Sequence, residues 1–167
     1  MKLIKPSISF QESYNAYIKE LGDESRHPFP MDFDHRDFAA MLAKIEQYEQ
    51  GIDLPTGYEP STTYWLVDGD ELIGAANLRH QLSDILKQAG GHIGLGIRPK
   101  YRGQGLSVKL LNMTLAKARN MGINPVEVHC YQDNLPSAGM IKACGGVFHS
   151  SHLMDNGKTI DRYVIKR

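Results

Sequence analysis

Apolar residues recur at helical spacing in the first part of the chain. Tyr14, Ile18 and Leu21 lie four and three positions apart and predict a helix over residues 10–21. Gly22 follows directly and is the expected stop, because glycine commonly ends a helix.

A second helical pattern runs to about Gln50. Asp34 or Asp37 is its expected cap, and Gly51 its expected end. Its buried face is marked by four apolar side chains: Phe38, Met41, Leu42 and Ile45. The glycines and prolines of residues 51–60 then indicate an exposed loop.

The pattern changes to runs of strand-forming residues after this loop. Asp68-Gly69-Asp70 is a hairpin turn signal between two such runs. Strands are predicted at 63–67, 71–78, 92–97, 125–131, 147–154 and 159–165. Helices are predicted at 81–89, 105–121 and 137–144. This order favours an α/β domain over residues 1–167, with one layer of sheet and helices on both faces.

Composition and charge narrow the possible functions. The chain has 167 residues, of which 41% are hydrophobic and 23% charged, as expected for one domain with a real core. With 19 basic and 19 acidic side chains the net charge is zero, which argues against a nucleic-acid partner. The balance conceals a gradient, because residues 1–96 carry a net −7 and residues 97–167 a net +7. The gradient is either scattered surface charge or a sign that the two halves face different partners.

Two cysteines, Cys130 and Cys144, are too few for a disulfide scaffold. The chain start lacks the pattern of a signal peptide, and no stretch approaches the roughly 18 apolar residues of a membrane span. We therefore expect a cytoplasmic protein with no membrane partner. His149 and His152 lie near Cys144, but the spacing does not match a zinc site, so we expect no metal.

The segment Ile97–Ser107 lies between a predicted strand and the clearest predicted helix. Glycines in such a turn let backbone N–H groups converge on an anion, and the helix N-terminus adds a positive dipole end. Four cationic side chains surround this point: Arg98, Lys100, Arg102 and Lys109. We interpret the segment as a pyrophosphate cradle. Its glycines match neither the P-loop nor the dinucleotide spacing, and a simple tight turn is the alternative.

Within this segment, Arg102-Gly103-Gln104-Gly105-Leu106-Ser107 resembles the coenzyme A signature of the GNAT superfamily of N-acetyltransferases, Gln/Arg-x-x-Gly-x-Gly/Ala. Ser107 stands where that family has Gly or Ala, and it is small enough to let a phosphate approach. Asn134-x-x-Ser137, followed by Ile141 and Gly145-Gly146, is similar to the second coenzyme segment of the family. The resemblance covers residues 63–165. Three segments resemble one bacterial branch of predicted acetyltransferases with no assigned acceptor: Tyr64-Trp65-Leu66-Val67-Asp68, Leu78-Arg79-His80 and Gly90–Gly94.

The resemblance implies one GNAT-like domain whose mostly antiparallel sheet splays open between two parallel strands. Acetyl-CoA would be the co-substrate. Backbone groups of Ile97 and Arg98 would hold its pantetheine, and the amides of Arg102 to Ser107 its pyrophosphate. Asn134 and Ser137 would contact the pantetheine arm.

The implied reaction is direct transfer of acetyl to a primary amine of a small molecule or peptide. A module that binds acyl-CoA without catalysis, or a transferase of another acyl group, is the alternative.

The sequence offers several candidates for the general acid and the general base of this reaction. Many family members use a Tyr as the acid seven residues after the Asn, where this chain has Ile141, so Tyr131 is the substitute candidate. His92 and His129 are the candidate bases, because histidine titrates near neutrality. Glu127 and His80 are weaker candidates, and a structural role is the alternative for each histidine.

The acceptor side is expected to come from the helices within residues 10–50, acting as a lid, and from the loop 51–60. An aromatic wall is expected from Phe29, Phe33, Tyr58 and Tyr64. Four acids are expected to favour a cationic amine: Asp32, Asp34, Asp37 and Glu59. The alternative is an ordinary amphipathic lid with solvated acids. A homodimer is compatible with this fold.

Overall fold

The computed structural model describes residues 1–167 and contains seven strands and five α-helices. The strands are β1 (Lys2–Ile4), β2 (Ser61–Asp68), β3 (Glu71–Arg79), β4 (Ile93–Ile97), β5 (Val126–Tyr131), β6 (Val147–Leu153) and β7 (Thr159–Ile165). The α-helices are α1 (Gln11–Leu21), α2 (Phe38–Gln50), α3 (Asp84–Gln88), α4 (Leu106–Asn120) and α5 (Leu135–Ala143). Short 3₁₀ turns are η1 (Ile8–Phe10), η2 (Phe29–Asp32) and η3 (Pro99–Tyr101). None of the helices has the length and apolar character of a membrane span.

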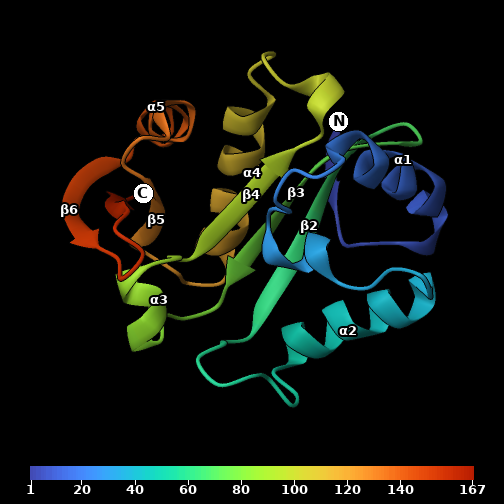
Figure 1. The fold of residues 1–167 in the computed structure, drawn as a ribbon, viewed down its shortest axis with the longest axis horizontal. Helices are drawn as coiled ribbons and strands as arrows, with labels where there is room; N and C mark the ends of the chain where they lie inside the picture. The colour runs from blue at the N-terminus through green and yellow to red at the C-terminus, as the bar shows by residue number, and fades with distance from the viewer.

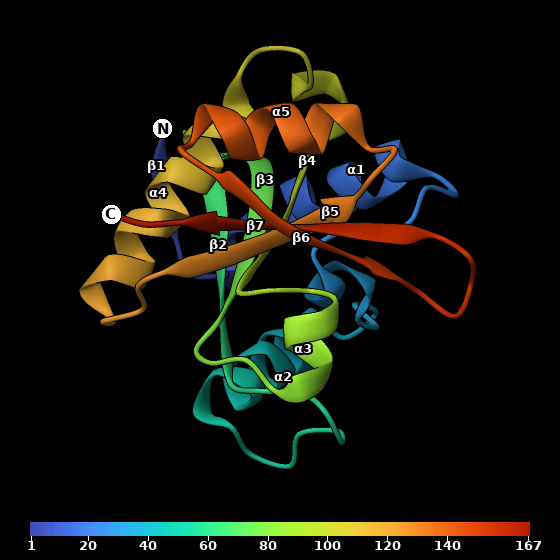
Figure 2. The same cartoon turned by 90° about the vertical axis from the view of Figure 1, so that its left-hand side faces the viewer.

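The strands form two hydrogen-bonded sheets in place of the single layer predicted from the element order. One sheet has the order β1-β2-β3-β4 and the other β5-β7-β6, and every pairing within them is antiparallel. Figure 1 shows β2, β3 and β4 at the centre of the molecule, and Figure 2 shows the second sheet with α5 above it. This division confirms the mostly antiparallel, splayed α/β fold that the resemblance implies.

Alternating side chains of β2 explain how helices cover both faces of the first sheet. Trp65 and Val67 pack with α1 and α2, whereas Leu66 packs with Leu110 of α4. Since β2 is buried on both faces, its sequence is a continuous run of strand-forming residues and does not alternate between apolar and polar side chains. A further cluster of α4, β5, β7 and α5 residues, including Leu111 and Tyr163, connects the two sheets.

Most elements lie where the apolar pattern predicts them, and the differences have local causes. The Asp37 carboxylate accepts from the Ala40 N–H and is therefore the cap of α2, while Asp34 pairs with Arg36 outside the helix. Helix α5 begins earlier than predicted, at Leu135, because the Asn134 side chain caps it. The predicted helix 81–89 is shorter, and β1 was not predicted.

A reciprocal pair of hydrogen bonds joins the two sheets at one point. The His92 N–H donates to the Glu127 carbonyl oxygen at 2.8 Å, and the Glu127 N–H donates to Nδ1 of His92 at 2.9 Å. Gly91 is required beside this joint, because a Cβ there would lie 2.7 Å from the Glu127 carbonyl oxygen. With Nδ1 accepting, the ring is neutral, and burial, helped by the charge of Arg79, lowers the pKa of His92 to about 4.

Because the folded chain holds this imidazole neutral, acid should weaken the fold. As pH falls from 6.5, the ordinary pKa, toward about 4, the unfolded chain takes up a proton that the folded chain does not. Above pH 6.5 both states are neutral and the full stability is present. We expect His92→Asn to reduce the wild-type loss of unfolding free energy over this range by about 1–3 kcal/mol.

Urea unfolding at constant ionic strength between pH 7.5 and 4 measures this difference. His149→Asn is the matched control. Because His149 is exposed and lies away from the joint, this variant should keep the wild-type pH dependence of the unfolding free energy. An unchanged pH dependence in the His92 variant would contradict the assignment of His92 to the joint.

Candidate functional site

The two sheets separate beyond the His92–Glu127 joint. Both β4 and β5 begin at this joint and run away from it, so they diverge without any hydrogen-bonded ladder between them. Figure 2 shows the two strands leaving the same region in different directions. The opening between them is a cleft of about 1150 Å³.

The hydrogen-bond alternation of each sheet directs backbone groups into this cleft, where the carbonyl oxygens of Ile97 and Tyr131 already accept from Arg102 Nε and from the Asn134 N–H. The Arg98 N–H bonds to the Ile73 carbonyl oxygen, so by alternation the backbone groups of Leu95 and Ile97 face away from β3. The Gln132 N–H bonds to the Thr159 carbonyl oxygen, so the backbone groups of residues 129 and 131 face away from β7. An extended ligand in the cleft would therefore find N–H and C=O partners on both sides.

Most of the coenzyme residues predicted from sequence line the cleft. Eight of them do so: Ile97, Arg102, Gly103, Gly105, Leu106, Ser107, Asn134 and Ser137. Arg98 and Gln104 do not, and the Gln104 amide is directed back to the Lys100 carbonyl oxygen. Of the catalytic candidates, His129 and Tyr131 line the cleft and His92 does not.

The start of α4 has the properties of an anion site. Gly103 and Gly105 adopt positive φ angles of 74° and 73°, and open space lies where their Cβ atoms would be. No side chain caps the helix, so the first N–H groups, from Leu106 onward, have no partner within the helix. Unpaired N–H groups and the helix dipole together favour a phosphate here.

The cations around this cradle differ in their availability. Arg102 reaches back to the Ile97 carbonyl oxygen through Nε, at 3.0 Å, and pairs with Glu24 at 3.0 Å. Its side chain remains 47% exposed, so it can exchange this carboxylate for a phosphate. Lys109 lies one turn into α4 and forms no ion pair.

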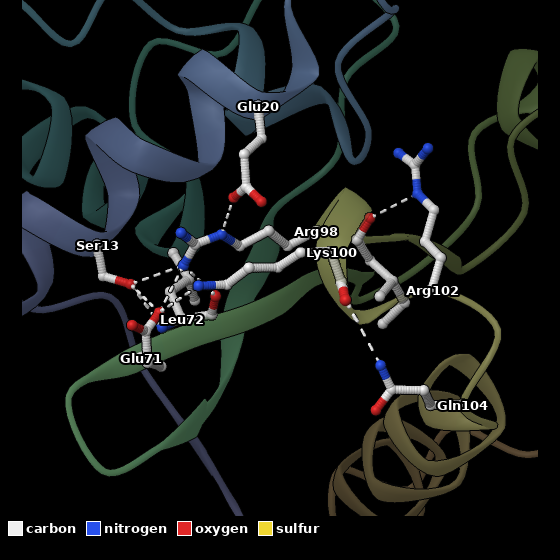
Figure 3. A network of polar contacts seen from close by, with 9 residues as sticks. Ser13, Glu20, Glu71, Leu72, Arg98, Lys100, Arg102 and Gln104 are labelled. Atoms are coloured by element: carbon white, nitrogen blue, oxygen red, sulfur yellow. Dashed lines mark hydrogen bonds and ion pairs between the residues drawn. The ribbon is translucent and has the colours of Figure 1, made fainter.

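Arg98, by contrast, is part of a buried ion-pair network and does not serve the cradle with its side chain. Figure 3 shows its guanidinium between Glu20 of α1 and Glu71 of β3, both of which it contacts. It also donates to the Ser13 hydroxyl at 3.1 Å and to the Leu72 carbonyl oxygen at 3.3 Å. Its N–H donates to the Ile73 carbonyl oxygen of β3, so this group is not directed into the cleft, and of the two residues expected to hold the pantetheine Ile97 is the one that lines the cleft.

The second coenzyme segment forms the opposite wall of the cleft. The Asn134 side chain accepts from the Ser137 N–H at 3.2 Å and caps α5, which leaves its amide N–H₂ free. Ile141, where many relatives have a tyrosine, is fully buried and packs in the core that connects the sheets. The chain therefore has no acid at that position.

Among the catalytic candidates, His129 is buried beside the cleft and has ring nitrogens without partners. Its side chain is only 2% exposed, and neither ring nitrogen has a hydrogen-bond partner. Burial, with the charge of Arg162 and two further neighbours, lowers the pKa of His129 to about 4, so the ring is neutral at pH 7 despite Glu127 at 3.7 Å. Tyr131 follows on the same strand, 37% exposed, with the Lys158 ammonium 5.0 Å from its ring centre.

The acceptor face of β4 carries no side chains, a feature that the sequence analysis missed. Gly94 and Gly96 face the segment after α1, and a Cβ on Gly96 would overlap the His27 carbonyl oxygen. His27 and Pro28 therefore lie directly on the strand. The signal in the sequence is the alternation of glycines in Gly94-Leu95-Gly96, with both glycines on one face.

The expected aromatic wall is present in part, and the expected acids lie outside the cleft. Phe29 contacts Phe33 and Tyr58 at ring distances of 5.8 and 5.5 Å, and of these three only Phe29 lines the cleft. Tyr64 belongs to the core that connects the sheets. None of the four acids lines the cleft: Asp32, Asp34, Asp37 and Glu59. Glu24, the one acid that does, pairs with Arg102.

Comparison with solved structures places this architecture among known acetyltransferases. An acetyl transferase from Salmonella typhimurium that modifies the N-terminal serine of ribosomal protein L7/L12 is 13% identical, with a TM-score of 0.72 over 99% of this chain and 94% of that chain. A chimera of the Vibrio cholerae spermidine N-acetyltransferase SpeG with hSSAT is 15% identical, with a TM-score of 0.67 over 99% and 96%.

The microcin C7 self-immunity acetyltransferase MccE, in complex with acetyl-CoA and AMP, is 14% identical, with a TM-score of 0.70 over 99% of this chain and 91% of that chain. At these identities the likeness establishes the fold alone. No curated protein sequence matches the chain. The family model described as acetyltransferase (GNAT) family matches residues 18–145, which include β4, the glycine cradle and the α5 wall. The chain therefore belongs to the acetyltransferase (GNAT) family.

Proposed function

We propose that this protein transfers the acetyl group of acetyl-CoA directly to a primary amine of a small molecule or peptide. The observation that carries the proposal is the splayed cleft with an uncapped, glycine-lined helix start at its edge. A long ligand with phosphates at one end and a thioester at the other fits such a site. Membership of the acetyltransferase (GNAT) family supports the same reaction.

The residues present fit coenzyme A. The unpaired N–H groups at the start of α4 would hold the pyrophosphate, with Arg102 and Lys109 as counter-charges. The outward backbone groups of Leu95 and Ile97 would bond to the pantetheine as a neighbouring strand does. Asn134 and Ser137 would contact the same arm from the other wall.

The chemistry requires a neutral amine and a stabilised oxyanion. We assign to His129 the removal of a proton from the acceptor ammonium, directly or through water, which gives the neutral amine that attacks, because the His129 ring is neutral and its nitrogens are unpartnered. A backbone N–H of β4 would donate to the oxyanion. Tyr131 would protonate the departing thiolate in place of the tyrosine that Ile141 replaces.

A valine at Gly105 should abolish the phosphate cradle. The side chain would stand in the open space above the helix start, and it would strain a residue at φ 73°. We expect coenzyme A to bind at least about 30-fold more weakly, since several charge-assisted hydrogen bonds are lost. Isothermal titration calorimetry measures the affinity.

Gly122→Val is the matched control for this variant. Gly122 follows the other end of α4, with a similar φ of 76° and open space around it, and it does not line the cleft. It should therefore cause similar strain and leave coenzyme affinity unchanged. Equal weakening by both variants would attribute the effect to strain, and undiminished binding by Gly105→Val would refute the cradle.

A thiol-release assay with acetyl-CoA and a panel of primary amines tests catalysis. We expect acetylated amine and free thiol in equal amounts, and a kcat about 10- to 100-fold lower for Tyr131→Phe, with little change in KM. Tyr48→Phe is the control variant, because Tyr48 lies on α2 and does not line the cleft. Unchanged kcat in Tyr131→Phe would remove Tyr131 from the mechanism.

Tight coenzyme binding without thiol release for any amine would favour a second function, a non-catalytic acyl-CoA-binding module. The observation in its favour is the buried Ile141 in place of the usual acid. If thiol were released only from an acyl-CoA other than acetyl-CoA, the enzyme would transfer that other acyl group.

A further inference from the structure

Arg79 lies at the closed end of the cleft, where the two sheets meet. It is the last residue of β3, and its N–H donates to the carbonyl oxygen of His92, the residue of the joint, at 2.7 Å. Its side chain lines the cleft, and its guanidinium carbon lies 5.7 Å from the centre of the Phe29 ring. Arg79 thus belongs to the acceptor end of the cleft, away from the glycine cradle at its mouth.

The guanidinium of Arg79 is only partly used by the protein. Nη1 donates to the carbonyl oxygens of Gly90 and Gly91 at 3.2 and 3.0 Å. Arginine has five N–H donors, and those on Nε and Nη2 make no hydrogen bond here. These donors are available to a ligand.

No carboxylate neutralises this charge. Arg79 forms no ion pair, and burial lowers its pKa, opposed only by the Tyr58 hydroxyl. Arg79 is half-buried, and a partly desolvated cation without a counter-charge favours an anionic partner. Arg98 in the same protein shows the usual solution, with two carboxylates.

Neighbouring groups share this lack of partners. His129 has two unpartnered ring nitrogens, and Arg162, opposite it on β7, has a buried Nε without a partner. The Arg162 Nη atoms reach only the carbonyl oxygens of Lys87 and Ser151. The positive charges of Arg79 and Arg162 both contribute to the lowered pKa of His129. Two cations therefore lie near His129, whose Nε2 is 3.7 Å from the Glu127 carboxylate, and several hydrogen-bond donors of this region are unpaired.

We infer that the acceptor amine carries an anionic group, a carboxylate or a phosphate, which the free N–H donors of Arg79 bind at the closed end of the cleft. This inference rests on the proposed function and specifies its substrate class. It reverses the expectation of a cationic acceptor, because the acids behind that expectation lie outside the cleft. The planar donor pair Nε and Nη2 suits the two oxygens of a carboxylate or phosphate.

Matched amines provide the test. The panel holds chain length nearly constant and varies the far end: 4-aminobutyrate, 3-aminopropyl phosphate, butylamine and 1,4-diaminobutane. A second comparison is lysine with 1,5-diaminopentane, which differ only by the carboxylate of lysine. It tests another distance between the amine and the carboxylate. Calorimetry gives the affinity of each amine for the protein saturated with coenzyme A, and the thiol-release assay gives kcat/KM.

We expect the anionic amines to exceed their neutral and cationic counterparts by at least about tenfold in affinity and in kcat/KM, the effect of one charge-assisted contact. Arg79→Gln should bring this ratio close to one, and Arg79→Lys should restore part of it. Arg36→Gln is the charge-matched control. Arg36 is exposed, pairs with Asp34 and lies outside the cleft, so this variant should keep the wild-type ratio.

The outcomes separate the inference from the proposed function. Stronger binding of the diamine or of butylamine to the wild-type protein overturns the inference, and this result needs no variant to fold. An anionic preference that Arg79→Gln leaves intact overturns the role of Arg79. Preferential binding of anionic amines without thiol release supports the inference while the proposed function fails. A preference for carboxylate over phosphate, or the reverse, identifies the anion.

Discussion

The buried charge of Arg98 is the constraint on which the arrangement of the cleft depends. This residue is only 4% exposed, and a guanidinium in such surroundings must be paired. Its partners, Glu20 and Glu71, come from α1 and from the start of β3, so neutralising one charge fixes the first helix against the sheet (Figure 3). With α1 fixed, the segment that follows it lies over β4 and forms one wall of the acceptor end.

The same network explains the opposite charges of the two halves of the sequence. Carboxylates of the first half pair with cations of the second: Glu20 and Glu71 with Arg98, Glu71 with Lys100, and Glu24 with Arg102. Part of the gradient therefore records contacts within the molecule rather than two surfaces for different partners. Only the Arg98 pairs are buried enough to determine position, because exposed pairs contribute little.

The sequence predicted the elements and the glycine turn before α4 because both depend on local patterns. The apolar spacing predicts helix α4. A glycine at position 105 is expected because the turn before a helix requires unusual backbone geometry. The roles of Arg98 and His92 could not be predicted, because their partners are distant in sequence, such as Glu20 and Glu127. Strand β1 was missed for a similar reason, since three residues form a strand only by pairing with β2.

The two ends of the cleft therefore differ in how the sequence encodes them. The proposed coenzyme end would use backbone N–H groups, so it requires small residues at fixed spacing and leaves a recognisable motif. The proposed acceptor end would use side chains from β3, β5 and the segment after α1, while Gly94 and Gly96 contribute none. We expect substitutions at Arg79 or His129 to alter acceptor recognition without touching the helix start that we propose to hold the phosphates. Such a separation lets one family keep its coenzyme while its acceptors diverge.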